Sequence, residues 1–271
     1  MPDDVRLAVA GRIARIVIDR PATRNAIDRG VMATLGRLLD ELDERIGSGD
    51  VGVVAIRGGG DRAFISGGDL KELAQIRTET EAAAMSLTMR GVLDRVATLP
   101  VPTVALVNGD AYGGGAEVAV ACDIRLAADG SRIAFNQVAL GVMPAWGGIE
   151  RLVTLVGRGR ALHLLLTGAV LDTRAAAQAG LVEQVASREQ FDAQADALLA
   201  RLAAVPATPA RAIKSLVGSA APASWPQLAD VACAEFARSW VADDHWQAVS
   251  AAQEQRRARK ACGRSGDHGG Q

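Results

Sequence analysis

Over the first 145 residues, short apolar runs alternate with helical spacings of hydrophobic positions. Residues 5–9 and 13–18 are predicted to form two strands joined by a turn at residues 10–12, and residues 51–56 a third strand. Apolar residues at i, i+4 and i+7 predict a helix that follows residue 28 and another over about 80–97. Their apolar faces comprise Val31, Leu35, Leu38, Leu39 and Leu42 in the first helix and Met85, Met89, Val92, Leu93 and Val96 in the second. Residues 103–107 form a near-continuous apolar run, which is typical of a strand buried on both faces.

From about residue 145 onward, helical patterns dominate. A short apolar helix over 116–121 and strands over 124–127 and 132–135 complete the alternating part. Helices are then predicted at about 148–156, 158–166, 173–179, 188–204, 209–217, 225–240 and 244–259, with one strand at 181–185. The pattern favours an α/β core over residues 1–200 and a helical segment over residues 201–262. The polar, glycine-rich tail over residues 263–271 is expected to be disordered.

Two glycine-rich turns carry the main functional signal of the sequence. Each turn follows a short apolar run and opens into a helical pattern. The turns are Phe64-Ile65-Ser66-Gly67-Gly68-Asp69-Leu70-Lys71 and Asn108-Gly109-Asp110-Ala111-Tyr112-Gly113-Gly114-Gly115-Ala116-Glu117. Glycine before a helix lets the backbone approach a ligand closely and leaves N–H groups unpaired at the helix start. Two such N–H groups from separate turns can form an oxyanion hole, which stabilises negative charge on a carbonyl oxygen.

Composition and charge exclude several classes of protein. The 271 residues are 49% hydrophobic, which is ample for one core, and the formal net charge is −1, which argues against nucleic-acid binding. Cys122, Cys233 and Cys262 lack metal-ligand spacing and are expected to be free thiols. No apolar run follows the acidic N-terminus, and no uncharged apolar stretch reaches the roughly 18 residues of a membrane span. A soluble cytoplasmic protein is therefore expected.

With these motifs, the chain resembles the crotonase family, also called the enoyl-CoA hydratase/isomerase family. The resemblance covers about residues 5–260 and rests on both glycine turns together with the segments Pro21-Ala22-Thr23-Arg24-Asn25-Ala26, Cys122-Asp123-Ile124-Arg125, Leu140-Gly141-Val142-Met143-Pro144 and Gly147-Gly148. It implies an α/β spiral of ββα repeats with a C-terminal helical trimerisation segment. It also implies an enzyme that binds acyl-CoA thioesters, with no metal or redox cofactor, since coenzyme A enters as part of the substrate.

The resemblance also assigns site residues. The backbone N–H groups of Gly68 and Gly114 would form the oxyanion hole and point into one cavity, and Glu117 would occupy the position of the first of two catalytic glutamates in family hydratases. The substrate-binding positions would be Arg24, Ala26, Ser66, Gly67, Gly68, Asp69, Leu70, Lys71, Gly114 and Trp146.

The chain departs from the two-glutamate pattern. Counting back from Gly141, the second glutamate position falls on Gln137, and no acidic residue lies between Gly130 and Val142. An amide cannot ionise to accept a proton, so it can only form hydrogen bonds. Efficient hydration that relies on two carboxylates is therefore in doubt.

A second local resemblance concerns the segment around Trp146-Gly147-Gly148. It is similar to a decarboxylase branch that acts on ethylmalonyl- and methylmalonyl-CoA and carries no second glutamate. Loss of CO₂ delivers electrons to the thioester directly, so one acid, Glu117, would suffice to protonate the enolate. We expect an acyl-CoA lyase that decarboxylates a short alkylmalonyl-CoA. The alternatives are an enoyl-CoA hydratase or isomerase with one carboxylate, and a non-catalytic acyl-CoA binder.

The C-terminal helical patterns predict a trimer or a multiple of three. They carry Trp225, Phe236, Trp240 and Trp246 in a chain of which only 3% is aromatic, and such an apolar helical segment requires a surface to cover. Light scattering at micromolar concentration should give a mass close to three or six chains. A monomeric mass would contradict the prediction.

Overall fold

The computed structural model describes residues 4–73, 75–76, 78–219 and 254. The chain forms two compact units, Met1–Val205 and Pro206–Gln271. In the second unit, the described element is helix α9 (Ala207–Ser219), as expected from the pattern at 209–217. Both helices predicted beyond it, the tail and the four C-terminal aromatic residues lie outside the described residues, so the trimer stays a prediction.

A six-stranded sheet forms the base of the first unit. Its strand order is β1-β2-β3-β5-β7-β10, and all neighbours pair in parallel except β1 and β2. The strands are β1 (Val5–Ala10), β2 (Ile13–Ile18), β3 (Val53–Gly58), β5 (Thr103–Val107), β7 (Ile124–Ala128) and β10 (Gln184–Ala186). The predicted strands at the N-terminus, at 103–107 and at 124–127 are confirmed.

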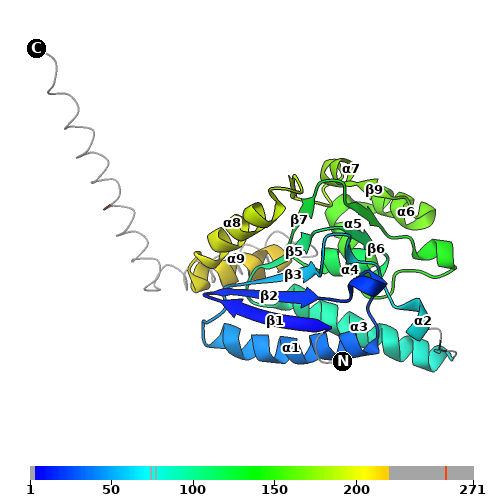
Figure 1. Ribbon diagram of the computed structural model, residues 1–271, viewed down its shortest axis with the longest axis horizontal. Coiled ribbons are helices and arrows are strands. Elements are labelled where there is room, and N and C mark those ends of the chain that lie inside the picture. The colour runs from blue at the N-terminus through cyan, green and yellow to red at the C-terminus, as the bar shows by residue number, and fades with distance from the viewer. Residues whose placement is uncertain (1–3, 74, 77, 220–253, 255–271) are drawn as a thin grey trace, which may run out of the picture. The chain divides into compact units, whose positions relative to one another are not determined.

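The two faces of this sheet bury alternate residues of the same strands, because side chains alternate across a strand. Val54, Ala105 and Ala127 pack into the larger core with helices α1 (Arg29–Gly47), α3 (Glu79–Thr98) and α4 (Gly114–Ala121). Val53 and Val104 pack on the other face against helix α8 (Phe191–Ala203). Figure 1 shows α1 and α3 on one side of the sheet and α8 on the other. Burial on both faces explains why β5 is almost entirely apolar.

A second, four-stranded sheet positions the two glycine turns. Its order is β4-β6-β8-β9, with strands β4 (Ala63–Ile65), β6 (Asp110–Tyr112), β8 (Arg132–Ala134) and β9 (Leu171–Asp172). Strands β4 and β6 pair in parallel, and each runs directly into one of the turns. The remaining elements are η1 (Pro21–Thr23), α2 (Leu70–Leu73), η2 (Gln137–Leu140), α5 (Gly148–Val156), α6 (Arg158–Thr167) and α7 (Thr173–Gln178).

The strand predicted at 181–185 is wrong at its start. Leu181 and Val182 are buried in the larger core before the chain reaches the sheet, and β10 begins only at Gln184. The buried Arg125 accounts for this arrangement, because its guanidinium donates a hydrogen bond of 2.9 Å to the Leu181 carbonyl. The apolar residues Leu181 and Val182 therefore indicate burial in the core rather than strand pairing.

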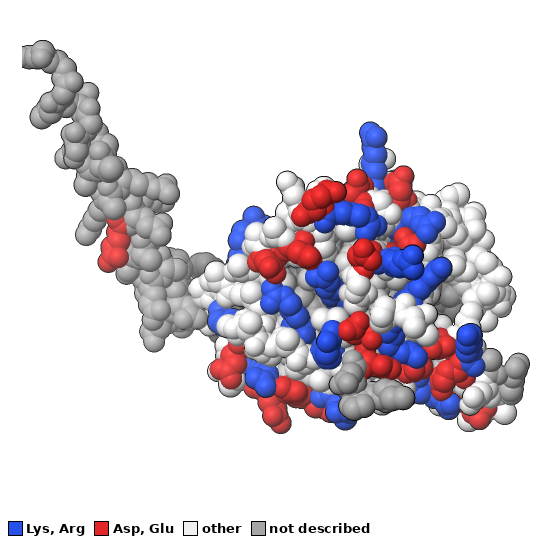
Figure 2. All heavy atoms as spheres, viewed as in Figure 1, with Lys and Arg blue, Asp and Glu red and all other residues white. Residues whose placement is uncertain are grey.

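Charges are mixed on the surface of the molecule. Figure 2 shows basic and acidic side chains interspersed over the face turned to the viewer, which agrees with the net charge of −1. Among the helices that the structure describes, none combines the length and the apolar character that crossing a bilayer requires.

Two buried asparagines hold the loop between β3 and β4, which leads to the first glycine turn. The Asn108 side chain accepts a hydrogen bond from the Gly58 N–H and donates to the carbonyls of Gly58 and Gly60, at 3.1, 3.0 and 2.7 Å. Asn25 donates to the carbonyls of Gly59 and Ala63, at 3.0 and 2.8 Å. Their amide groups therefore replace the backbone pairing that this loop lacks.

Asn108→Leu should destabilise the protein by more than about 2 kcal/mol, because each buried backbone group left without a partner costs about 1–3 kcal/mol. Urea unfolding followed by circular dichroism measures the loss. Gln194→Ala on the exposed side of α8 is the control and should change stability by less than about 0.5 kcal/mol. A loss of that small size for Asn108→Leu would show that the loop holds without the asparagine.

Candidate active site

The two glycine turns lie side by side at the ends of β4 and β6. Gly67 has a φ of +107°, and a Cβ added to it would lie 3.1 Å from the Tyr112 carbonyl oxygen and 3.4 Å from the Gly114 nitrogen. Gly68 and Gly114 line the same cavity of about 970 Å³, which we call the reaction cavity. Within the part of the chain that the structure describes, neither of their N–H groups donates a hydrogen bond. Both amides are therefore available to an oxygen in this cavity.

Glu117 lies in the first turn of α4 and is buried, with 2% of its surface exposed. Its Oε1 accepts hydrogen bonds from the Trp146 and Gly148 N–H groups, at 2.8 and 3.0 Å. Its Oε2 accepts one from the Gln137 side-chain amide, at 2.9 Å. The sequence Gly147-Gly148 permits this close approach, since Gly147 has a φ of +89° and a Cβ on Gly148 would lie 2.5 Å from Cγ of Glu117.

The environment of Glu117 shifts its pKa upward. Burial raises the pKa of Glu117, and although the hydrogen bonds from Trp146, Gly148 and Gln137 lower it, the net shift is upward from the ordinary value. A carboxyl group with a raised pKa, held in a cavity, is a candidate general acid and base.

Gln137 lies beside Glu117, where the resemblance places the second glutamate. It begins η2 and lines the reaction cavity. Its Nε2 donates to Glu117, whereas its Oε1 is buried without a hydrogen-bond partner among the described residues. An unpaired acceptor at this position suits a ligand or water that donates a hydrogen bond.

The Trp146 indole forms the wall behind the glycine amides. Only 6% of its surface is exposed, and a Cβ on Gly114 would overlap its six-membered ring. A Cβ on Gly68 would lie 3.8 Å from Cη2 of the same ring. Glycine is required at position 114 because the indole occupies the space of a side chain.

Two residues that the sequence did not indicate fix the turn before α5. The Arg151 guanidinium donates a hydrogen bond of 3.1 Å to the Trp146 carbonyl and forms an ion pair with Asp94 of α3. The Ser86 hydroxyl, also on α3, donates to the Ala145 carbonyl at 2.8 Å. Helix α3 thus holds the turn whose N–H groups bind Glu117. No local pattern predicts these contacts, because the partners are distant in the chain.

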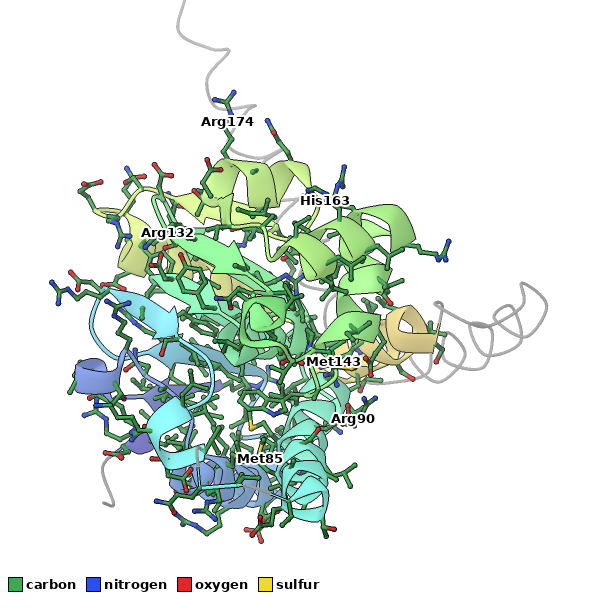
Figure 3. All side chains as sticks on the ribbon, turned by 90° about the vertical axis from the view of Figure 1, so that its right-hand side faces the viewer. Met85, Arg90, Arg132, Met143, His163 and Arg174 are labelled. Carbon is green, nitrogen blue, oxygen red and sulfur yellow. The ribbon has the colours of Figure 1, made fainter. Side chains whose placement is uncertain are left out.

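The remaining walls of the reaction cavity are mostly apolar. Among the described residues that line it, Glu117 is the only one with an ionisable side chain. Met85 comes from α3 and Met143 from the loop before α5, and Figure 3 shows both on the same side of the molecule. The apolar lining also includes the exposed side chains of Leu70, Val138, Leu140, Val142 and Met143.

A smaller cavity of about 280 Å³, the arginine cavity, lies next to the first glycine turn. Its lining residues are Arg24, Arg62, Ala63, Ser66, Asp110, Tyr112 and Arg132. Ser66 lines both cavities. Arg132 is paired with Asp110, whereas Arg24 and Arg62 form no ion pair within the described part of the chain. This cavity therefore offers unpaired positive charge.

The predicted site residues divide into three groups. The reaction cavity brings together Ser66, Gly67, Gly68, Leu70, Gly114, Glu117, Gln137 and Trp146. The arginine cavity contains Arg24. Neither cavity is lined by Ala26, Asp69 or Lys71. Two of these residues contact Arg20 instead. Its guanidinium forms an ion pair with Asp69 at 3.1 Å and donates a hydrogen bond to the Ala26 carbonyl at 2.5 Å.

Comparison with known proteins gives consistent matches over most of the chain. A family model described as enoyl-CoA hydratase/isomerase matches residues 9–258. A Mycobacterium bovis protein named "Probable enoyl-CoA hydratase echA8" is 34% identical over 77% of this chain and 79% of its own length. A Xenopus tropicalis ethylmalonyl-CoA decarboxylase is 33% identical over 76% of this chain and 68% of its own length.

Solved structures confirm the fold that the resemblance implied. An enoyl-CoA hydratase from Bacillus anthracis superposes with a TM-score of 0.89 at 26% identity, over 93% of this chain and 97% of that chain. A Thermobifida fusca protein described as "a putative enoyl-CoA hydratase", in complex with CoA, superposes with a TM-score of 0.79 at 32% identity, over 88% of this chain and 93% of that chain.

The raised pKa of Glu117 predicts a stability that falls with rising pH. Between the unfolded-state pKa and the higher folded-state pKa, the folded protein binds more protons than the unfolded chain, so the free energy of unfolding decreases as pH rises. Glu117→Gln should remove this dependence, and when the Gln137 amide turns over, the new amide nitrogen at position 117 donates to Gln137 Oε1. At pH 7–8 the variant should melt above the unmodified protein, by roughly 2–4 °C for each kcal/mol gained.

Melting temperatures measured from pH 4 to pH 8 provide the test. The advantage of Glu117→Gln should shrink toward pH 4, where the unmodified carboxyl is protonated in both states. Glu44→Gln, on the exposed part of α1, is the matched control. Its difference in melting temperature from the unmodified protein should not change with pH. A Glu117→Gln variant that melts lower at every pH would mean that the site stabilises the carboxylate.

Proposed function

Because the chain belongs to the enoyl-CoA hydratase/isomerase family, we propose that it converts an acyl-CoA thioester through an enolate. In this proposal, the Gly68 and Gly114 N–H groups bind the thioester oxygen, and Glu117 carries the proton. The observation that supports it best is the buried Glu117 carboxyl, with its raised pKa, in the same cavity as two glycine amides without acceptors.

The proposed oxyanion hole supplies the electrostatic part of catalysis. A thioester enolate carries its charge mainly on oxygen, and preorganised N–H donors in a water-poor cavity stabilise such charge by about 3–4 kcal/mol for each donor. The Trp146 ring supports this role, because it covers the backs of both glycines and excludes water from that side.

The arginine cavity is the proposed position of the CoA phosphates. Arg24 and Arg62 provide positive charge, because the Asp110 carboxylate in this cavity is paired with Arg132, and guanidinium groups match phosphate geometry. Ser66 connects this cavity to the reaction cavity, so the CoA portion and the thioester would lie on either side of the first glycine turn. The Thermobifida fusca relative is named as a CoA complex, which is consistent with this ligand class.

Hydration of a 2-enoyl-CoA, or isomerisation by the same proton transfers, is the reaction that we propose first. In hydration, water oxygen attacks the β carbon, its proton passes to the Glu117 carboxylate, and the electrons move onto the thioester oxygen. Glu117 then returns the proton to the α carbon. Gln137 Oε1, which is buried and unpaired, would accept a hydrogen bond from the water and orient it. The names of the relatives favour this reaction over the decarboxylation expected from the sequence.

Decarboxylation of an alkylmalonyl-CoA is the second candidate, supported by the neutral Gln137 and by the decarboxylase relative from Xenopus tropicalis. Here the bond between the α carbon and the carboxylate carbon breaks. CO₂ leaves, the electron pair of that bond moves onto the thioester, and Glu117 protonates the α carbon. No described basic side chain lines the reaction cavity, so the substrate carboxylate would be poorly solvated there, which favours its loss as CO₂. Glu117 would have to be neutral, which its raised pKa supports.

A panel of enoyl-CoA, 3-hydroxyacyl-CoA and alkylmalonyl-CoA thioesters, with products identified by mass, separates the two reactions. Glu117→Gln should lower either activity by about 10²–10⁴-fold, the usual contribution of a general acid or base. Gln137→Glu should raise hydration of crotonyl-CoA by supplying a second carboxylate, but it should not raise CO₂ release. Hydration that is unaffected by Glu117→Gln would contradict the role of Glu117.

A further inference from the structure

Helix α3 separates the reaction cavity from a third cavity, which we call the side cavity. The side cavity has a volume of about 340 Å³ and lies between α1, residues 75–76 and α3. Positions 81, 84, 85 and 88 of α3 face it, which is the i, i+3, i+4, i+7 face of the helix. Positions 82, 85 and 86 line the reaction cavity. Among the described residues, Met85 is the only one that lines both cavities.

The side cavity can accept an apolar chain. Part of its lining consists of Met32, Ala33, Ile76 and Ala84. Its charged members already have partners, because Arg29 forms an ion pair with Glu72, and Glu81 accepts hydrogen bonds from Thr78 at 2.9 and 3.2 Å. A hydrocarbon in this cavity would therefore leave those ion pairs and hydrogen bonds intact.

We propose that Met85 closes the acyl end of the reaction cavity and sets the longest acyl chain that the protein accepts. This inference rests on the proposed acyl-CoA function. The CoA portion enters past Ser66, the thioester lies at Gly68 and Gly114, and the acyl chain extends toward Met85. In Figure 3, Met85 lies among the side chains between α1 and α3.

The position of Met85 explains why one side chain has this effect. It is half-buried against the larger core, so it fills the junction rather than projecting into solvent. Its reaction-cavity neighbours on α3 do not close that junction, since Ala82 is small and the Ser86 hydroxyl binds the Ala145 carbonyl. Met85→Ala removes the described side chain that lines both cavities, so we expect it to join them.

Calorimetric titration with CoA and with saturated acyl-CoAs of four to twelve carbons tests the proposal without requiring turnover. For the unmodified protein, affinity should rise with chain length and then level off when the chain reaches Met85. In Met85→Ala, the rise should continue for at least two further carbons, by about fourfold for each additional buried methylene. Met85→Val should give a smaller extension, and it serves if the alanine variant does not fold.

Two further variants separate a specific effect from general loosening. Met85→Leu keeps the volume and should keep the original limit. Ala84→Leu fills the side cavity. Alone, it should leave the chain-length limit unchanged, and in the Met85→Ala background it should restore the shorter limit. An unchanged chain-length profile in both Met85→Ala and Met85→Val would overturn the role of Met85. Failure of CoA and of every acyl-CoA to bind the unmodified protein would instead overturn the proposed function.

Discussion

The site depends on one buried interaction, the carboxyl group of Glu117 held by the backbone N–H groups of Trp146 and Gly148. Burial of a carboxyl group is costly unless its oxygens find donors, and here both oxygens do. The interaction joins α4, which starts at the second glycine turn, to the turn that precedes α5. Its geometry therefore sets the position of Trp146, and through Trp146 the wall of the proposed oxyanion hole.

Close packing makes this arrangement intolerant of side chains at three glycines. A Cβ on Gly114 would overlap Trp146, one on Gly115 would overlap the Ile65 carbonyl, and one on Gly148 would overlap Glu117. Gly114 and Gly115 belong to the second glycine turn and Gly148 begins α5, and each glycine accommodates a neighbour from another segment. The glycine turns are thus required for packing as much as for ligand approach, and a single substitution would disturb both.

The two sheets have different structural roles, and together they position the site. The six-stranded sheet is packed on both faces and gives a rigid base. The four-stranded sheet consists of strands of two or three residues, and its function is to set the glycine turns beside each other. Within this frame, the amide of Gln137 faces Glu117 at the position where the resemblance implied a second carboxyl. The family fold alone does not decide which reaction follows.

The sequence by itself determined the features that depend on neighbouring residues. Hydrophobic periodicity predicted α1, α3 and the buried strand β5, the glycine motifs predicted both turns, and the resemblance assigned the position of Glu117. Only the tertiary structure decided the contacts between distant segments, such as Arg151 with Asp94, Trp146 with Gly114, and Met85 between two cavities. The short strands β4, β6 and β9 were also missed, because two or three residues carry too little periodicity. Local patterns fix which face of an element is buried, but the partner of that face is set by how the whole chain packs.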